Sequence, residues 1–296
     1  MHKVLLTGHS GFLGKNLANK FKDKCSLLLC LVGPSGEKVS NSHVKKIKFC
    51  KLDDFDKNFN DKFGKIDTVI HLATRYDFNS TKEEIRNCNY LVPKIILDNS
   101  VNIGFKNFIS TGSFYRKIKS PYQRLPFYTS TKIEFEKYLK KYSNENEIRA
   151  INLIIHQLYG PNDSSYKFTE NIISNLKKDK REINLTRGDQ TRDFIYVDDA
   201  SSAIIKIITN LKFFSNNYHE FDLGSGSETS IRSFVETAKK ILNSKTKLNF
   251  GKLNYRDNEL MSSKADINVL LELGWNPLFD IERGIKKIFE AKKNKE

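Results

Sequence analysis

The chain has 296 residues, of which 39% are hydrophobic and 29% charged, the balance of a globular protein and not of a disordered one. Its 50 basic and 35 acidic residues give a formal net charge of +15, but the lysines are spread along the chain without an aromatic-interleaved stripe. This favours a solvated basic surface over a nucleic-acid footprint. The longest apolar run, residues 26–32, is too short to span a bilayer, and residues 1–7 lack a signal-peptide pattern, so we expect a cytoplasmic protein.

The first predicted strand, residues 3–7, runs directly into a glycine-rich turn that is followed by a helical pattern. Gly8, Gly11 and Gly14 have the spacing GxxGxxG. Glycines in such a turn let the backbone approach a pyrophosphate, and the following helix N-terminus stabilises the negative charge. An ordinary glycine-rich turn is the alternative, but the order strand, turn, helix predicts a dinucleotide site.

The second predicted strand, residues 26–32, has no acidic residue directly after it to bind the adenosine ribose hydroxyls. Ser35 and Lys38 could instead accept a 2′-phosphate, which favours NADP(H) over NAD(H). A third strand is predicted at residues 46–51. Asp53, which follows it, could line the adenine pocket or stand in a solvated turn.

A fourth buried strand is predicted at residues 67–74, with small residues at its carboxyl end. We interpret His71 within it as a packing or hydrogen-bonding residue, because no second ligand stands at a metal-site spacing. A helical pattern containing Asn89 reaches Val101, and a strand at residues 107–110 follows. Strands that alternate with helices in this way predict an α/β fold with a Rossmann-type, doubly wound parallel sheet.

Just past that strand comes Ser113, and Tyr128 and Lys132 then stand four residues apart where a helical pattern begins. Residues at this spacing share one helix face, so the phenol and the ammonium would project together. A neighbouring ammonium favours the phenolate, and we therefore predict a lowered pKa for Tyr128 and a role as proton donor.

The pattern of predicted elements changes from about Phe168 onwards. We expect a dinucleotide-binding domain at residues 1–165, to which the chain returns near residues 193–224, and a smaller, discontinuous α/β lobe at residues 166–296. The later predicted elements are strands at 151–155, 183–185, 194–197 and 220–223, helices at 168–178, 198–208 and 231–242, and an amphipathic terminal helix. The four cysteines form no CxxC pair, so buried thiols are expected and a zinc site is not.

The glycine turn, Ser113 and the Tyr128-x-x-x-Lys132 pair together resemble the extended short-chain dehydrogenase/reductase family. Four further motifs extend the resemblance over nearly the whole chain: HLAT at 71–74, YGP at 159–161, RDFIYVDD at 192–199 and LGWNP at 273–277. Within the family the chain is most similar to the CDP-abequose and CDP-paratose synthase group, through the GxQxRDFI run at 188–195 and the RDNExM run at 256–261.

The resemblance implies a catalytic set of Ser113, Tyr128 and Lys132, a nucleotide-diphosphate sugar as substrate, and a homodimer without metal. The implied cofactor-binding residues are Gly8, Ser10, Gly11, Phe12, Leu13, Gly14, Ser35, Asp53, Leu72, Ala73, Thr74, Asn89, Tyr128 and Lys132. The implied substrate-binding residues are Tyr76, Ser113, Phe114, Gln157, Arg192 and Arg256. For the two arginines, a diphosphate contact and an ordinary ion pair are the alternatives; Gln157 stands where the family usually has asparagine.

The residues around Ser113 exclude some of the reactions that the family catalyses. Dehydratases of the family place an Asp-Glu pair where Phe114 and Tyr115 stand here, and the GDP-fucose synthase type needs a cysteine beside the serine, whereas no cysteine follows Cys88. Reduction of a C4 ketone with NADPH remains, with NAD-dependent 4-epimerisation as the alternative. A dinucleotide-binding sensor or RNA-associated protein is an alternative of another class, because a fold does not fix a function.

Overall fold

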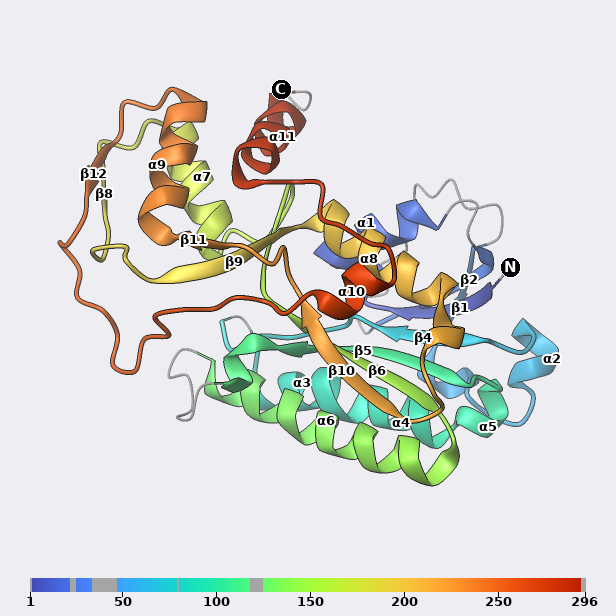
Figure 1. Ribbon diagram of the computed structural model, residues 1–296. Helices are drawn as coiled ribbons and strands as arrows, with labels where there is room; N and C mark the ends of the chain where they lie inside the picture. The colour runs from blue at the N-terminus through green and yellow to red at the C-terminus, as the bar shows by residue number, and fades with distance from the viewer. Residues whose placement is uncertain (1, 22–24, 34–46, 79, 118–124, 294–296) are drawn as a thin grey trace. The chain divides into compact units, whose positions relative to one another are not determined.

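The computed structural model describes residues 2–21, 25–33, 47–78, 80–117 and 125–293 (Figure 1). The chain divides into two compact units. The first unit comprises Met1–Ile154 and Ser201–Phe221, and the second comprises Ile155–Ala200 and Asp222–Glu296. Both units are therefore built from two separate stretches of chain.

A seven-stranded sheet in the order β10-β6-β5-β4-β1-β2-β3 forms the centre of the first unit. Its strands are β1 His2–Thr7, β2 Cys25–Leu31, β3 Ile47–Cys50, β4 Thr68–His71, β5 Asn107–Ser113, β6 Arg149–Ile155 and β10 Tyr218–Leu223. The pairs β1–β2, β2–β3, β1–β4 and β4–β5 are parallel. The chain moves outwards from β1 first in one direction and then in the other, so the predicted doubly wound Rossmann-type sheet is confirmed.

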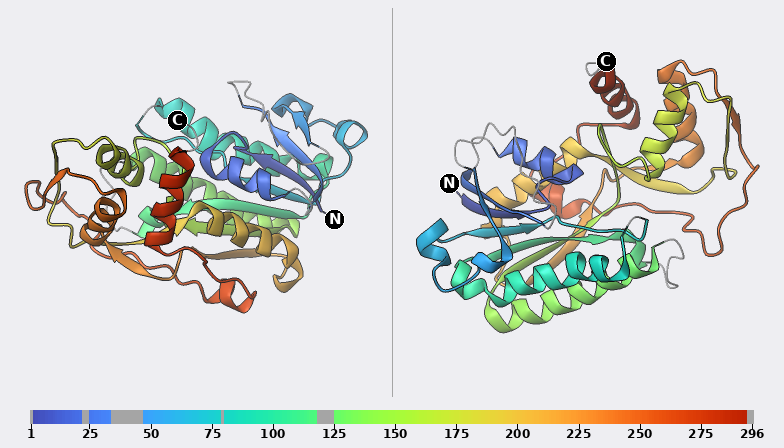
Figure 2. Two further views of the ribbon diagram at one scale, coloured as in Figure 1. Left: turned by 90° about the horizontal axis from the view of Figure 1, so that it is seen from above. Right: turned by 180° about the vertical axis from the view of Figure 1, so that it is seen from behind.

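Helices cover both faces of this sheet: α1 and α8 lie on one face and α3, α4 and α6 on the other (Figures 1 and 2). The helices are α1 Phe12–Lys20, α2 Phe59–Phe63, α3 Lys82–Arg86, α4 Val92–Asp98, α5 Ser100–Ile103, α6 Pro126–Asn146 and α8 Val197–Thr209, with short turns η1 Leu52–Asp54, η2 Asn87–Leu91, η3 Phe114–Lys117 and η4 Leu211–Phe213. A core under α4 and α6 includes Val69, Ile96, Phe108, Phe135 and Leu139, each at most 3% exposed. Burial of such side chains is worth roughly 1.5–3 kcal/mol each.

Two predicted elements differ from the structure. The helix expected to reach Val101 is divided into a π-turn, η2, followed by α4 and α5. Residues 82–98 are helical without a break, and the π-turn η2 lies just before Pro93, whose missing N–H could not donate to the preceding turn of a regular α-helix. The strand expected at residues 107–110 continues as β5 to Ser113, so this serine ends the strand instead of following it.

The second unit contains a three-stranded sheet and a two-stranded sheet. Its elements are β7 Gln157–Tyr159, β8 Glu182–Asn184, β9 Thr191–Tyr196, β11 Glu228–Ser230 and β12 Lys247–Asn249, with helices α7 Phe168–Lys177, α9 Ile231–Leu242, α10 Asn268–Glu272 and α11 Ile281–Lys293. In the larger sheet β9 pairs in parallel with β7 and antiparallel with β11.

A buried carboxylate on β9 organises the loops of this unit. Asp193, which has no exposed surface, accepts hydrogen bonds from the N–H groups of Ser225, Gly226 and Ala265 at 2.6–3.1 Å and from the Ser225 hydroxyl at 2.9 Å. Four donors offset the desolvation of one carboxylate, so Asp193 has a structural role.

Candidate functional site

The glycine turn after β1 has the close backbone approaches that the sequence predicts. Gly8 has a φ of +70°, in the left-handed region that favours glycine, and the N–H of Gly11 donates to its carbonyl at 2.9 Å. A Cβ atom on Gly14 would lie 1.9 Å from the Gly8 oxygen, and one on Gly8 would lie 2.5 Å from the Ala73 nitrogen. Larger residues would therefore open the turn and separate β1 from the end of β4.

Helix α1 starts directly after this turn, with Gly11 as its N-cap and without an acidic residue in its first turn. No side chain caps the helix, so its first N–H groups and its dipole can stabilise a bound anion. Leu13 is buried beneath the turn, and Ser10 and Phe12 are half-buried beside it. The turn and helix thus fit the pyrophosphate of a dinucleotide.

The carboxyl ends of β1 and β4 meet beside the turn, where Thr7 pairs in register with His71. The Thr7 hydroxyl lies 2.9 Å from Nδ1 of His71 and accepts from the Ala73 N–H at 3.2 Å. Burial, together with the charge of Lys132, lowers the pKa of His71 well below its ordinary value of 6.5, so its ring is neutral. The hydrogen-bonding role expected for His71 is confirmed.

Ser113, Tyr128 and Tyr76 come together from three elements of the first unit. The Tyr128 hydroxyl hydrogen-bonds with those of Ser113 and Tyr76. The ring of Tyr76 stacks on that of Tyr128, with centroids 4.7 Å apart and an interplanar angle of 29°. Ser113 and Tyr128 are only 5% and 6% exposed. The predicted pair of hydroxyls therefore lies together, with an aromatic wall on one side.

Lys132 lies one helical turn after Tyr128 on α6 and is 6% exposed. Its Nζ donates to the Thr111 carbonyl at 2.9 Å and to the Thr74 hydroxyl at 3.1 Å. Burial lowers the pKa of Lys132 to about 8, so the ammonium is retained at neutral pH but lost on the alkaline side. Thr74, predicted to contact the cofactor, thus orients the lysine.

The predicted direction of the Tyr128 pKa is wrong. Burial raises the pKa of Tyr128 well above its ordinary value of 10, and the nearby Tyr76 adds to the rise, while the bond to Ser113 opposes it. The cost of desolvating a phenolate outweighs the field that a lysine one turn away was expected to supply. Tyr128 consequently keeps its proton at neutral pH.

A carboxylate from the loop after β4 holds the first turn of α6. Asp77 accepts from the N–H of Phe127 at 3.3 Å and from that of Tyr128 at 3.0 Å. Leu125, the N-cap residue of α6, has no side-chain acceptor, so Asp77 replaces a local cap. Sequence reasoning missed Asp77, since a cap supplied from 50 residues away leaves no local pattern.

Three other residues predicted to bind the cofactor stand as follows. Asn89 is fully buried and joins the backbone of Arg75 to the Thr131 hydroxyl, which ties the loop after β4 to α6. Asp53 is exposed in η1. Ser35, like Lys38, lies outside the described residues.

In the second unit, the Arg192 guanidinium is bound by other residues of the protein. It is 6% exposed, pairs with Glu259 at 2.6 Å and donates to the carbonyls of Thr191 and Leu260 at 2.7 and 2.6 Å. A diphosphate would have to compete with Glu259 for this guanidinium, so the ion-pair interpretation gains support. Arg256 is exposed, and Gln157 begins β7. Phe114, in the first unit, is buried and packs against Tyr115 with ring centroids 4.2 Å apart.

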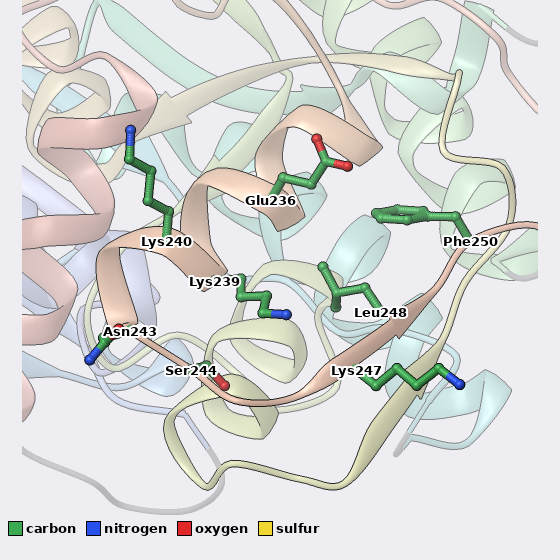
Figure 3. Close-up of a pocket in the computed structure, with 8 residues that line it drawn as sticks. All are labelled: Glu236, Lys239, Lys240, Asn243, Ser244, Lys247, Leu248 and Phe250. Atoms are coloured by element: carbon green, nitrogen blue, oxygen red, sulfur yellow. The ribbon is translucent and has the colours of Figure 1, made fainter.

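A surface hollow of about 700 Å³ lies at the end of α9 (Figure 3). Its lining residues are Glu236, Lys239, Lys240, Asn243, Ser244, Lys247, Leu248 and Phe250, none of which the sequence predicts for catalysis or binding.

Within the described ranges no cluster of three or more His, Cys, Asp or Glu could hold a metal ion. No helix in the described part of the chain is both long and apolar enough to cross a membrane.

Comparisons with known proteins identify the family of the chain. Residues 4–224 match the model of the NAD dependent epimerase/dehydratase family. The chain is 31% identical over 292 residues to a CDP-abequose synthase of Salmonella muenchen, covering 98% of each protein. It is 25% identical over 316 residues to a putative UDP-glucose 4-epimerase of Methanocaldococcus jannaschii, again covering 98% of each. Its fold matches the UDP-glucose 4-epimerase of Thermotoga maritima with a TM-score of 0.81 at 20% identity, over 99% of this chain and 100% of that one.

The family match covers the glycine turn, the β4 edge and the Ser113, Tyr128 and Lys132 site in one continuous stretch. An enzyme with a nicotinamide dinucleotide cofactor follows from that match and from the fit of the glycine turn. The chain belongs to the NAD dependent epimerase/dehydratase family.

Proposed function

We propose that this protein reduces the C4 ketone of a nucleotide-linked 4-keto-deoxyhexose with NADPH, in the synthesis of surface polysaccharide sugars. CDP-4-keto-3,6-dideoxyglucose is the favoured substrate. The single observation that carries the proposal is the buried Ser113–Tyr128 hydroxyl pair beside Lys132, with the aromatic pair Phe114 and Tyr115 where a dehydratase would have two acids. The likeness to CDP-abequose synthase over nearly the whole chain supports the choice of sugar.

The residues divide the reaction between them. A bound nicotinamide dinucleotide would supply the hydride for the ketone carbon. Ser113 hydrogen-bonds and orients the ketone oxygen, and Tyr128 donates its proton to that oxygen, so the product is an alcohol. Lys132 would hold the nicotinamide ribose and, as an ammonium, would stabilise the tyrosinate left behind, which regains a proton from solvent. Proton transfer of this kind contributes roughly 10²–10⁴-fold to the rate.

The cofactor and substrate contacts are proposed on the same basis. The glycine turn and the N-terminus of α1 hold the pyrophosphate, and the loop containing Ser35 and Lys38 would prefer NADPH. The exposed Arg256 is the proposed diphosphate ligand, and Arg192 could join it only by exchanging its ion pair with Glu259 for the diphosphate. A homodimer is proposed from the family resemblance.

The Tyr128→Phe variant tests this assignment. We expect kcat for ketone reduction to fall by roughly 10²–10⁴-fold, because the phenol is the proton donor, while the dissociation constant for NADPH stays unchanged. The assay is the loss of NADPH absorbance with a panel of CDP-, dTDP- and GDP-4-keto sugars, with the product configuration determined by NMR. Near-full activity of the variant would remove Tyr128 from the mechanism.

A nucleotide-sugar 4-epimerase is the second candidate, favoured by the 25% identity to a putative UDP-glucose 4-epimerase. An epimerase would reduce its own bound NAD⁺ and regenerate it within each turnover, so C4 inversion of a nucleotide hexose would proceed without added NADPH. Such inversion, seen by NMR together with no reaction of any 4-keto sugar, would replace the reductase proposal. Salt-sensitive RNA binding without any turnover would instead indicate a non-catalytic role.

A further inference from the structure

The short turn η3 starts directly after Ser113 and carries Arg116, which the sequence motifs do not single out. The Arg116 guanidinium forms ion pairs with Glu136 on α6 and with Glu220 on β10. All three side chains are only 21–23% exposed. Ion pairs at this depth lose less to solvent screening than exposed pairs, so they can fix the relative position of the elements that carry them.

Glu136 belongs to the same helix row as the catalytic residues. Tyr128, Lys132 and Glu136 follow one another at intervals of four residues and therefore share a face of α6. Lys132 is held by the Thr111 carbonyl, and the backbone of Tyr128 by Asp77. Glu136, the third residue on this face, accepts from Arg116, which lies in the turn that follows Ser113.

The second ion pair of Arg116, with Glu220, is connected through hydrogen bonds to β5, the strand that carries Ser113. Glu220 accepts from the Tyr218 hydroxyl at 2.6 Å and from the Asn152 amide at 3.3 Å. The Asn152 oxygen accepts from the Ser110 hydroxyl at 2.9 Å, and Ser110 lies in β5 three residues before Ser113. The link through Glu220 therefore stays within one sheet, from β10 through β6 to β5, whereas the bond to Glu136 joins the turn after Ser113 to α6.

The charges of Arg116, Glu136 and Glu220 stabilise this set of ion pairs. One guanidinium faces two carboxylates, and burial raises the pKa of Glu136 while Arg116 opposes that rise. Removal of one partner would leave partly desolvated charges uncompensated. The close packing of β5 adds to the constraint, since a Cβ on Gly112 would lie 2.5 Å from the Ile154 side chain.

We infer that Arg116 is a positioning residue, whose bond to Glu136 fixes Ser113 relative to the helix face that carries Tyr128 and Lys132. The inference rests on the proposed function, because it concerns the alignment of the two hydroxyls that would bind one ketone oxygen. Misplacement of reacting groups by about 1 Å can cost roughly 10²-fold in rate.

Two matched variants test the inference, since both remove one carboxylate charge from the same guanidinium. Glu136→Gln weakens the link to α6, and Glu220→Gln weakens the link to β10. We expect kcat to fall by roughly 10- to 100-fold in Glu136→Gln, with KM and NADPH affinity nearly unchanged, and to fall less than about threefold in Glu220→Gln. Equal losses in the two variants, or no loss in Glu136→Gln, would overturn the inference.

Arg116→Lys provides a second comparison if Glu136→Gln fails to fold. A lysine keeps the charge but forms a single point contact instead of a fork, so kcat should recover partly relative to Arg116→Ala. Thermal unfolding of every variant separates lost stability from lost alignment. A kcat for Arg116→Lys no higher than that of Arg116→Ala, at equal folded fraction, would contradict the positioning role.

Hydrogen exchange without substrate distinguishes failure of this inference from failure of the proposed function. The backbone amides of residues 113–117 should exchange faster in Glu136→Gln than in Glu220→Gln, whatever the substrate proves to be. Unchanged exchange in both variants would exclude the positioning role even if ketone reduction is observed.

Discussion

The hydroxyl of Tyr128 lies among other hydroxyl and aromatic side chains, bonded to Ser113 and Tyr76 and almost without exposure to water. A buried phenolate is costly, so the residue remains protonated through neutral pH. Reduction of a ketone consumes a proton at the oxygen. The resting form of Tyr128 is therefore the form that the proposed reaction needs.

The burial of Lys132 should affect how the free energy of unfolding depends on pH. Its pKa falls from 10.5 to about 8 on folding, so the buried ammonium costs about 3 kcal/mol below pH 8. Between about pH 8 and 10.5 the unfolded chain binds more protons than the folded one, and stability rises with pH. Lys132→Met removes this effect. The stability advantage of the variant over the wild type should shrink by about 3 kcal/mol across this window, as measured by denaturant unfolding.

Lys137→Met is the control for this prediction, because Lys137 is exposed on the same helix. Its stability difference from the wild type should stay constant over the same pH range. A constant difference for Lys132→Met as well would contradict the burial of a charged amine. Activity should be lost in Lys132→Met at every pH.

At the scale of the elements, α6 depends on a neighbouring loop for its start. The helix carries Tyr128 in its first turn, where helices fray most readily, and its N-cap residue offers no acceptor. Asp77 supplies both the acceptor and a negative charge near the positive end of the helix dipole. The loop after β4 thus orders the turn that presents Tyr128, the proposed proton donor.

Asp77→Ala should lower the free energy of unfolding by about 1 kcal/mol and should also lower kcat, because the first turn of α6 loses its cap. Thr81→Ala is the matched control. Thr81 caps α3 through the Glu84 N–H at 3.2 Å, so its removal should cost a similar free energy without an effect on kcat. Urea unfolding and steady-state kinetics on both variants check the prediction, which equal losses of kcat would contradict.

At the scale of the whole molecule, the net charge of +15 produces a positive field that attracts anions. The proposed nucleotide-diphosphate sugar and NADPH are both anionic, so this field should assist their encounter with the enzyme. The hollow at the end of α9 adds Lys239, Lys240 and Lys247 to one stretch of this surface (Figure 3).

A higher salt concentration should therefore slow the association of substrate with the enzyme and leave the rate of the chemical step unchanged. The Debye length falls from about 30 Å at 0.01 M to about 10 Å at 0.1 M ionic strength. We expect kcat/KM for the anionic substrate to fall by roughly 10-fold over this range, with kcat constant. Steady-state kinetics at several NaCl concentrations measure this, with sucrose as an uncharged control solute. A fall in kcat that matches the fall in kcat/KM would rule out steering as the cause.

The elements that depend only on neighbouring residues follow from the amino-acid sequence. The alternation of strands and helices predicted the parallel sheet, and the amphipathic pattern gave helix α9 its observed bounds, Ile231–Leu242, after the capping Ser230. The glycine turn and the spacing of Tyr128 and Lys132 indicated the site for the same reason. A turn geometry or a helix face depends on residues only a few positions apart.

The hydrogen-bond and ion-pair partners of these residues, and their protonation, depend on the tertiary structure. The Asp77 cap, the Arg116 ion pairs and the engagement of Arg192 by Glu259 join residues 20 to 104 positions apart. The Tyr128 pKa is set mainly by burial, which a lysine four residues away cannot reveal. Desolvation and long-range contacts arise only when the sheet brings distant segments together, so no local pattern encodes them.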